Sequence, residues 1–167
     1  MNKKQIMVGL ISLLVGVTVY LIDRSPGHTY FISRTGSTIS LHHVLPPLFG
    51  YFAGSLPAFV HVFAFALLTS GILACKRKGC LIACIVWLSV DGAFELGQKF
   101  GGWSSSLVPS WFEGIPLLEN TVNYFALGTF DFMDLAAIVV GSVAAYLTMM
   151  CTSERRALSW VKQETVS

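Results

Sequence analysis

Four long apolar stretches alternate with mixed or polar segments along this chain of 167 residues. The stretches are Gln5–Ile22, Leu56–Cys75, Gly79–Gln98 and Phe132–Met150. Each is close to the roughly 20 residues that an α-helix needs to cross about 30 Å of hydrocarbon. The pattern therefore predicts an all-α, polytopic membrane protein with a single membrane domain, in which four transmembrane helices are connected by two outer loops and one tight inner turn.

The first stretch follows the basic start MNKK, as the apolar part of a secretory signal peptide would. Its run is longer than the roughly 7–15 residues usual in such peptides, and no A-x-A-like cleavage site follows it. We therefore expect the stretch to be retained as the first membrane helix.

Composition supports a membrane protein. Hydrophobic residues make up 54% of the chain and charged residues only 12%, whereas soluble domains carry about 25% charged residues. The lipid bilayer is thus the expected surrounding. The net charge of +2 is too small to indicate a nucleic-acid partner.

Basic residues predict the orientation, because they favour the cytoplasmic side of a membrane. Eight of the eleven fall at the ends that four spans would place together: Lys3, Lys4, Lys76, Arg77, Lys78, Arg155, Arg156 and Lys162. Seven of the nine acidic residues fall at the opposite ends: Asp23, Asp91, Glu95, Glu113, Glu119, Asp131 and Asp134. We expect a multi-pass protein of the plasma (inner) membrane with both termini in the cytoplasm.

The four cysteines all fall at predicted inner helix ends. They are Cys75, Cys80, Cys84 and Cys151. In a reducing cytosol they should remain free thiols that pack as small apolar side chains. A site with four sulfur ligands is the alternative, but C-x4-C-x3-C matches no standard zinc spacing. The sequence therefore predicts no metal and no cofactor.

The first outer loop, residues 23–55, divides into two parts. Alternating residues predict a short strand at Thr29–Ser33 with a turn at Arg34–Gly36. The part at Val44–Ser55 is nearly uncharged and rich in proline, so we expect it to lie along the membrane interface or to dip partly into it. Its aromatic residues suit the interfacial belt: Phe49, Tyr51 and Phe52.

The second outer loop, residues 99–130, is rich in aromatic residues and too long to lack structure of its own. We expect a short helix near Leu117–Phe125. The loop is either a structural lid that rests on the lipid headgroups or a lid that covers a substrate.

Polar residues are expected to converge near the outer ends of three helices. Asp91, Glu95 and Gln98 are spaced i, i+4 and i+7, which places them on one helical face. A charge at the bilayer centre costs at least about 2.5–3.5 kcal/mol on insertion scales, so these positions call for an explanation. Asp131 and Asp134 begin the fourth helix and His61 lies one turn into the second. Together the six residues predict a polar pocket that faces outward.

Three of these residues also have a structural interpretation, whereas Glu95 is the hardest to explain in this way. Asp131 or Thr129 can cap the fourth helix. Asp134 shares a face with small residues that should pack on another helix: Ala137, Gly141 and Ala144 or Ala145. His61 is either a satisfied buried histidine or a ring oriented by a carboxylate. No H-x-x-H or H-E-x-x-H spacing indicates a metal.

The segments FVHVFAFALLTSGIL, FELGQ and GTFDFMDLAAIVVGSVAAYL resemble the VanZ-like family of integral membrane proteins. In that family a His opens one helix, E-x-x-Q closes the next, and D-x-x-D leads a last helix that contains glycine. The matching positions here are His61, Glu95, Gln98, Asp131, Asp134 and Gly141, within a core of about residues 56–150. The family commonly has an Asn one turn after the second Asp, where this chain has Ile138, and many members have an Arg before the first Asp, where it has GTF.

The resemblance implies a role in the cell envelope, and the family is named for an association with resistance to a lipoglycopeptide antibiotic. We expect the polar pocket to bind a lipid-linked envelope component or a surface-active compound. One alternative is a membrane enzyme in which His61 and Glu95 form an acid–base pair acting on a lipid-linked substrate. The other is a structural subunit that acts through a membrane-protein partner.

Overall fold

The structure is a computed structural model, which describes residues 1–24, 40–42, 44–115 and 118–164, the last eleven of these by their backbone alone. The expected strand at Thr29–Ser33 and the turn at Arg34–Gly36 lie outside the described residues. Within the described part all regular structure is helical, as expected.

Four helices are long and apolar enough to cross a membrane. They are α1 (Lys3–Ile22), α2 (Leu56–Leu73), α3 (Arg77–Lys99) and the part Phe132–Ser153 of α6 (Phe132–Glu164). This confirms the all-α polytopic fold. Helix α2 ends two residues before the expected boundary because Ala74 adopts a left-handed conformation, with φ of 51°, and turns the chain towards α3.

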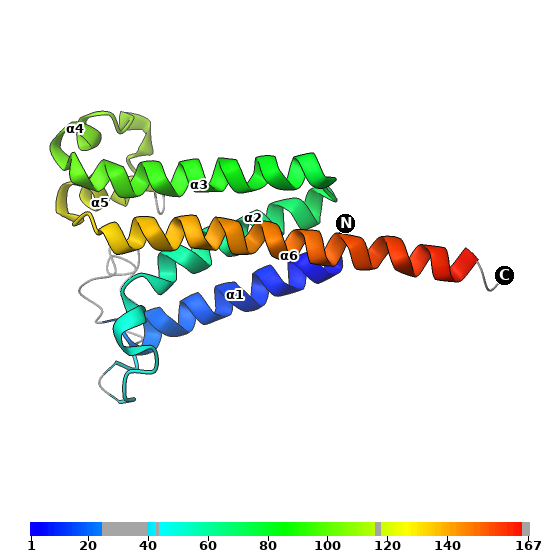
Figure 1. Cartoon of the computed structure of the whole chain (residues 1–167). Helices are drawn as coiled ribbons and strands as arrows, with labels where there is room; N and C mark the ends of the chain where they lie inside the picture. The colour runs from blue at the N-terminus through cyan, green and yellow to red at the C-terminus, as the bar shows by residue number, and fades with distance from the viewer. Residues whose placement is uncertain (25–39, 43, 116–117, 165–167) are drawn as a thin grey trace.

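The four helices form a bundle in which α2 packs against α1, α3 and α6 (Figure 1). The N-terminus, the α2–α3 turn and the C-terminal part of α6 lie at one end, which we call the turn end. The short helices α4 (Gly101–Ser106) and α5 (Thr121–Leu127) lie at the other end, which we call the cap end. Basic residues of α1 and of the α2–α3 turn thus share one end, as predicted. Which end faces the cytoplasm stays a prediction.

Small residues allow the helices to approach one another closely. A Cβ atom at Gly141 of α6 would lie 2.7 Å from the carbonyl oxygen of Phe59 in α2. One at Gly9 of α1 would lie 3.1 Å from the carbonyl oxygen of Ala64. Ala145 is fully buried on the Gly141 side of α6. The predicted small-residue face of the last helix therefore does pack against another helix.

A buried hydrogen-bond network holds the turn end together. The side-chain amide of Gln5 donates to the hydroxyl of Thr152 at 3.0 Å and to the carbonyl of Met149 at 3.4 Å. Its oxygen accepts from Ser70 at 3.4 Å, and the Ser70 oxygen is 3.2 Å from the sulfur of Cys80. The network thus connects α1, α2, α3 and α6, and satisfies a polar side chain that is almost fully buried.

The thiols partly match the expected packing role. Cys80 and Cys84 are buried in the apolar core with Leu67 and Met149. Cys75 is half-buried beside them, whereas Cys151 is exposed on α6.

The cap end consists of short helices separated by turns. The 3₁₀ turns η3 (Ser110–Phe112) and η4 (Leu118–Asn120) lie between α4 and α5. The helix expected near Leu117–Phe125 is therefore present from Leu118 onwards. In the first loop, the short η2 (Gly50–Ala53) is the only regular element among the residues described there. Two of its residues, Tyr51 and Phe52, are highly exposed, as side chains of an interfacial belt would be.

Candidate functional site

Glu95 lies near the end of α3 and connects it to the start of α6. Its side chain is only 5% exposed. One carboxylate oxygen accepts a hydrogen bond of 2.8 Å from the backbone N–H of Asp131. Glu95 thereby supplies an acceptor to one of the N–H groups at the helix start, where negative charge is also favoured by the helix dipole.

Asp131, one of the two residues expected as a cap, is the N-cap of α6. Its side-chain oxygen accepts from the backbone N–H of Met133 at 2.8 Å. The side chain is otherwise exposed. Its two roles, as cap and as donor to Glu95, account for its position without a ligand.

Asp134 is half-buried one turn further along, and its Oδ1 atom has no hydrogen-bond partner within the described part of the chain. The side chain of Ser55 interacts with this carboxylate, and Arg24 is close enough to contribute favourable charge. Arg24 also donates to the carbonyl of Gly54 and lies 5.2 Å from the ring centre of Tyr20. The buried Ile138 stands where the VanZ-like pattern commonly has an Asn.

The side-chain amide of Gln98 faces α5 and the residue that follows this helix. Gly128 makes room for it, because a Cβ there would lie 2.8 Å from its side-chain oxygen. Gln98 forms a hydrogen bond with the phenol of Tyr124. Burial, and then the negative charge of Glu95, raise the pKa of Tyr124 to about 12, although the Gln98 bond acts in the opposite direction. At neutral pH the phenol is a proton donor beside Glu95.

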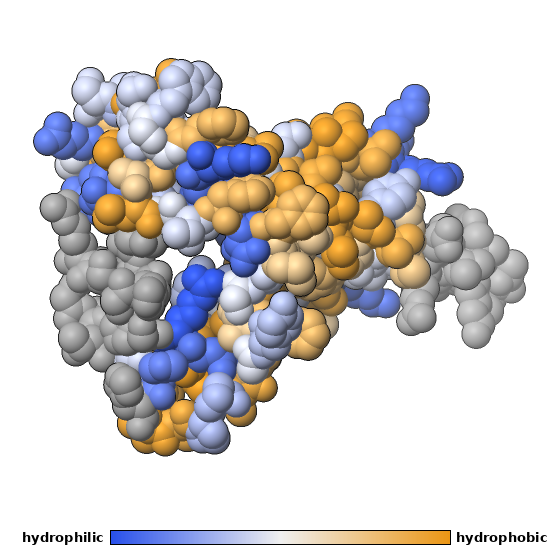
Figure 2. All heavy atoms as spheres, turned by 60° about the vertical axis from the view of Figure 1, so that its left-hand side comes forward, coloured by the Kyte–Doolittle hydropathy of each residue, from blue (hydrophilic) through white to orange (hydrophobic). Residues whose placement is uncertain are grey.

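We call Glu95, Asp131 and Asp134, with Gln98 and Tyr124 beside them, the acidic centre. It is built from α3, α5 and α6. Figure 2 brings this end of the molecule forward and shows hydrophilic residues gathered between two apolar regions.

His61 and Asp91 form a separate pair between α2 and α3. The Nδ1 atom of His61 is 2.8 Å from a carboxylate oxygen of Asp91. The imidazole is 49% exposed and the carboxylate 12%. The ring contacts Phe65 edge-on, with ring centres 4.4 Å apart, and Phe65 stacks on Trp87. The pairing differs from the His61–Glu95 pair of the enzyme hypothesis.

The six residues selected from the sequence thus fall into two groups. Glu95, Asp131 and Asp134 form the acidic centre with Gln98 beside them, whereas His61 and Asp91 bond to each other. Among the described residues no group of three or more His, Cys, Asp or Glu side chains is arranged to hold a metal ion. The sequence analysis missed three participants at the cap end: Arg24, Ser55 and Tyr124. Their proximity depends on contacts between distant segments.

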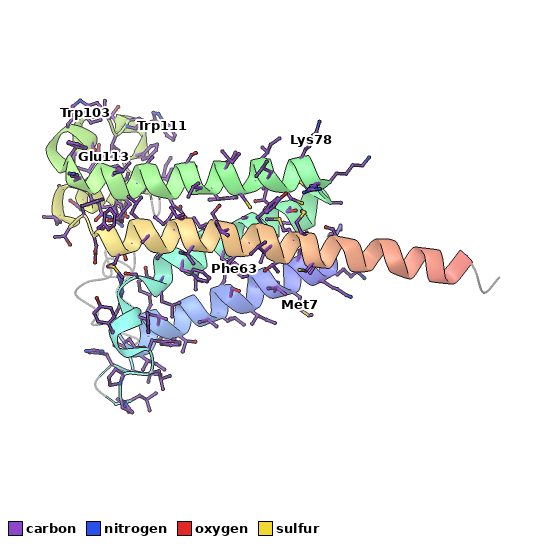
Figure 3. The ribbon with its side chains drawn as sticks, viewed as in Figure 1. Met7, Phe63, Lys78, Trp103, Trp111 and Glu113 are labelled. Atoms are coloured by element: carbon purple, nitrogen blue, oxygen red, sulfur yellow. The ribbon has the colours of Figure 1, made fainter. Side chains whose placement is uncertain are left out.

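An apolar cavity of about 380 Å³ lies on the opposite face of α3. It is open on one side and is lined by residues of α3, α4, the segment after α4 and α5. Its aromatic lining includes Phe94 and Phe125, whose rings stack with centres 5.4 Å apart. Figure 3 shows Trp103 and Trp111 on the outside of this cap. None of the residues that line the cavity belongs to the acidic centre, so the two sites are distinct.

Comparisons of the chain with protein-family models, with curated proteins and with solved structures find no match. The residues themselves are the basis for a functional proposal.

Proposed function

We propose that this is a VanZ-like integral membrane protein of the cell envelope whose acidic centre binds the polar part of a lipid-linked envelope component or a surface-active compound. The observation that carries the proposal concerns a buried oxygen of Asp134, near the buried Glu95. This oxygen has no hydrogen-bond partner among the residues that the structure describes. A buried polar atom of this kind is costly unless something bonds to it. A ligand with hydrogen-bond donors would supply that bond.

Charge selects the class of ligand. Two neighbouring carboxylates in a region of low dielectric attract a cation and repel a bare phosphate. Arg24 offsets only part of this charge. A primary amine or a group of sugar hydroxyls therefore suits the centre best, with the cap end on the outer side of the plasma membrane and the termini in the cytoplasm.

Native mass spectrometry of protein released from mild detergent tests the proposal. The probes are phosphatidylethanolamine, which carries an amine, and phosphatidylglycerol with the same chains. We expect the wild type to retain the amine lipid several-fold better, and Glu95→Gln to lose this preference. The matched control is Glu113→Gln, which removes an exposed carboxylate of the cap. If Glu95→Gln kept the wild-type preference, the acidic centre would not be the binding site.

A second candidate function is supported by the His61–Asp91 pair. A carboxylate on Nδ1 orients the imidazole and leaves Nε2 to exchange a proton, as in general acid–base catalysis. The half-exposed ring is reachable from outside the bundle. Turnover of a polyprenyl-linked or phospholipid substrate that His61→Ala and Asp91→Ala abolish would establish an enzyme. If both variants instead lowered only the yield of folded protein, the pair would be structural.

A further inference from the structure

The apolar cavity beside α3 has the walls of a site for hydrocarbon. Only two of its thirteen lining residues, Ser104 and Thr121, carry hydroxyl groups, and none is charged. The remaining walls are aliphatic or aromatic, and they include Ala93, Phe94, Phe100, Trp103, Phe112 and Phe125. Its volume of about 380 Å³ lies within the range of about 300–1,000 Å³ that small-molecule sites show.

The cavity continues a membrane-facing strip of α3. Ile82, Val86 and Ala93 follow the spacing i, i+4 and i+11, which places them on one face of the helix. Ile82 and Val86 are exposed in a segment that is apolar enough to span a membrane. Ser89, exposed at i+7 on the same face, is the polar residue between them and it carries no charge. A chain lying in the bilayer against this face therefore reaches the cavity without crossing a charged group.

The cap fixes the depth of the cavity in the membrane. Trp103 lines the cavity and is 67% exposed, and Trp111 in η3 is 62% exposed. Exposed tryptophans at the end of a membrane span are typical of the headgroup level. The cavity lies between these tryptophans and the last turns of α3. It is therefore at the depth where the hydrocarbon chains of the lipids begin.

The short helices α4 and α5, which we call the cap, pack closely against α3. A Cβ at Gly97 would lie 2.5 Å from the ring of Phe125, and one at Gly101 would lie 2.4 Å from the carbonyl oxygen of Phe125. These contacts hold α5 against α3 and maintain the cavity as a formed space. A transmembrane helix is about 10 Å across and cannot enter a cavity of this volume.

We propose that this cavity binds one hydrocarbon chain of a membrane lipid, held between α3 and the cap. The site lies on the opposite face of α3 from the acidic centre and does not depend on the function proposed there. It selects for a chain and not for a headgroup, because its lining bears no charge.

Tryptophan quenching by lipids with brominated chains tests the site directly. Two single-tryptophan proteins are compared in lipid nanodiscs, one retaining Trp103 and one retaining Trp111, with the other tryptophans replaced by Phe. Both indoles are similarly exposed, but only Trp103 lines the cavity. We expect brominated chains to quench Trp103 more strongly than Trp111.

A blocking variant separates the cavity from ordinary lipid contact. Ala93→Phe fills the cavity and should reduce the quenching of Trp103 to the level of Trp111. Val90→Phe is the matched control, since it enlarges an exposed apolar residue of α3 outside the lining. Equal quenching of the two tryptophans, or a loss that Val90→Phe reproduces, would overturn the proposal.

Native mass spectrometry provides a second measurement in case Ala93→Phe disturbs the fold. The wild type and the Glu95→Gln variant should each retain one molecule of phosphatidylglycerol. Retention that requires Glu95 would assign the lipid to the acidic centre and not to the cavity. A dimer of the protein without bound lipid would equally contradict the proposal.

Discussion

Glu95 accepts a hydrogen bond of 2.8 Å from the backbone N–H of Asp131, and so a carboxylate buried in α3 stabilises the first turn of α6. The two residues are 36 positions apart, Glu95 in α3 and Asp131 at the N-cap of α6. This contact makes Glu95 structural as well as a candidate for binding. The two roles can be separated by the choice of substitution.

Glu95→Gln should retain most of the stability, because the amide oxygen can still accept from the N–H of Asp131. Glu95→Ala leaves that N–H without its acceptor and should cost about 1–3 kcal/mol. Unfolding in mixed micelles with increasing SDS measures both variants. The exposed Glu113→Ala is the control and should have little effect. Equal losses for the Gln and Ala variants would contradict a role as acceptor.

Asp131→Ala should weaken α6 at its first turn by about 0.5–2 kcal/mol, since it removes the acceptor for the N–H of Met133. Asp131→Asn keeps an oxygen in the same place and should lose much less. Amide hydrogen exchange of residues 132–135 reports the effect locally. Unchanged exchange in the Ala variant would show that the cap contributes nothing.

Gly141→Ala should destabilise the bundle by about 1–3 kcal/mol, because the added Cβ would lie 2.7 Å from the Phe59 carbonyl oxygen and force α2 and α6 apart. Gly92→Ala is the matched control, since a Cβ there meets nothing within 4 Å. It should be neutral or stabilising by up to about 1 kcal/mol. The same SDS titration compares the two, and similar results at both positions would argue against close helix packing at Gly141.

The Gln5 network should appear as a coupling between helices. In a double-mutant cycle, Gln5→Ala and Ser70→Ala should interact by about 0.6 kcal/mol, with about 1.7 kcal/mol as the upper range for such bonds in membranes. Ser12→Ala is the control partner, because its hydroxyl donates to the carbonyl of Val8 within the same helix. Strictly additive effects of Gln5 and Ser70 would contradict the network.

Tyr124 should make stability fall at high pH. Its pKa is raised from 10.0 to about 12 in the folded protein. The unfolded state therefore loses its proton first, and the stabilisation present below pH 10 decreases as the pH rises towards 12. Ultraviolet difference spectra of tyrosinate should contain one late-titrating group that is missing from Tyr124→Phe. A Tyr124→Phe protein with the same alkaline loss of stability would exclude this residue as its cause.

Regular helical spacing made much of the molecule predictable. The four apolar stretches gave the spans, and the basic residues indicated which helix ends lie together. Asp131 could be recognised as a cap because capping involves only its own next few residues. Gly141 and Ala145 could be placed on a packing face because the period of a helix is fixed.

Contacts between helices could not be derived in this way, because they depend on how each helix is rotated and how closely it approaches its neighbours. The bond from Asp131 to Glu95, the pairing of His61 with Asp91 and the proximity of Arg24 to Asp134 all join distant segments. Helical periodicity placed Asp91 and Glu95 on one face, but it could not predict which residues of other helices they bond to. The apolar cavity could not be predicted from the sequence either. It depends on the close approach of α5 to α3 and α4, which Gly97 and Gly101 allow.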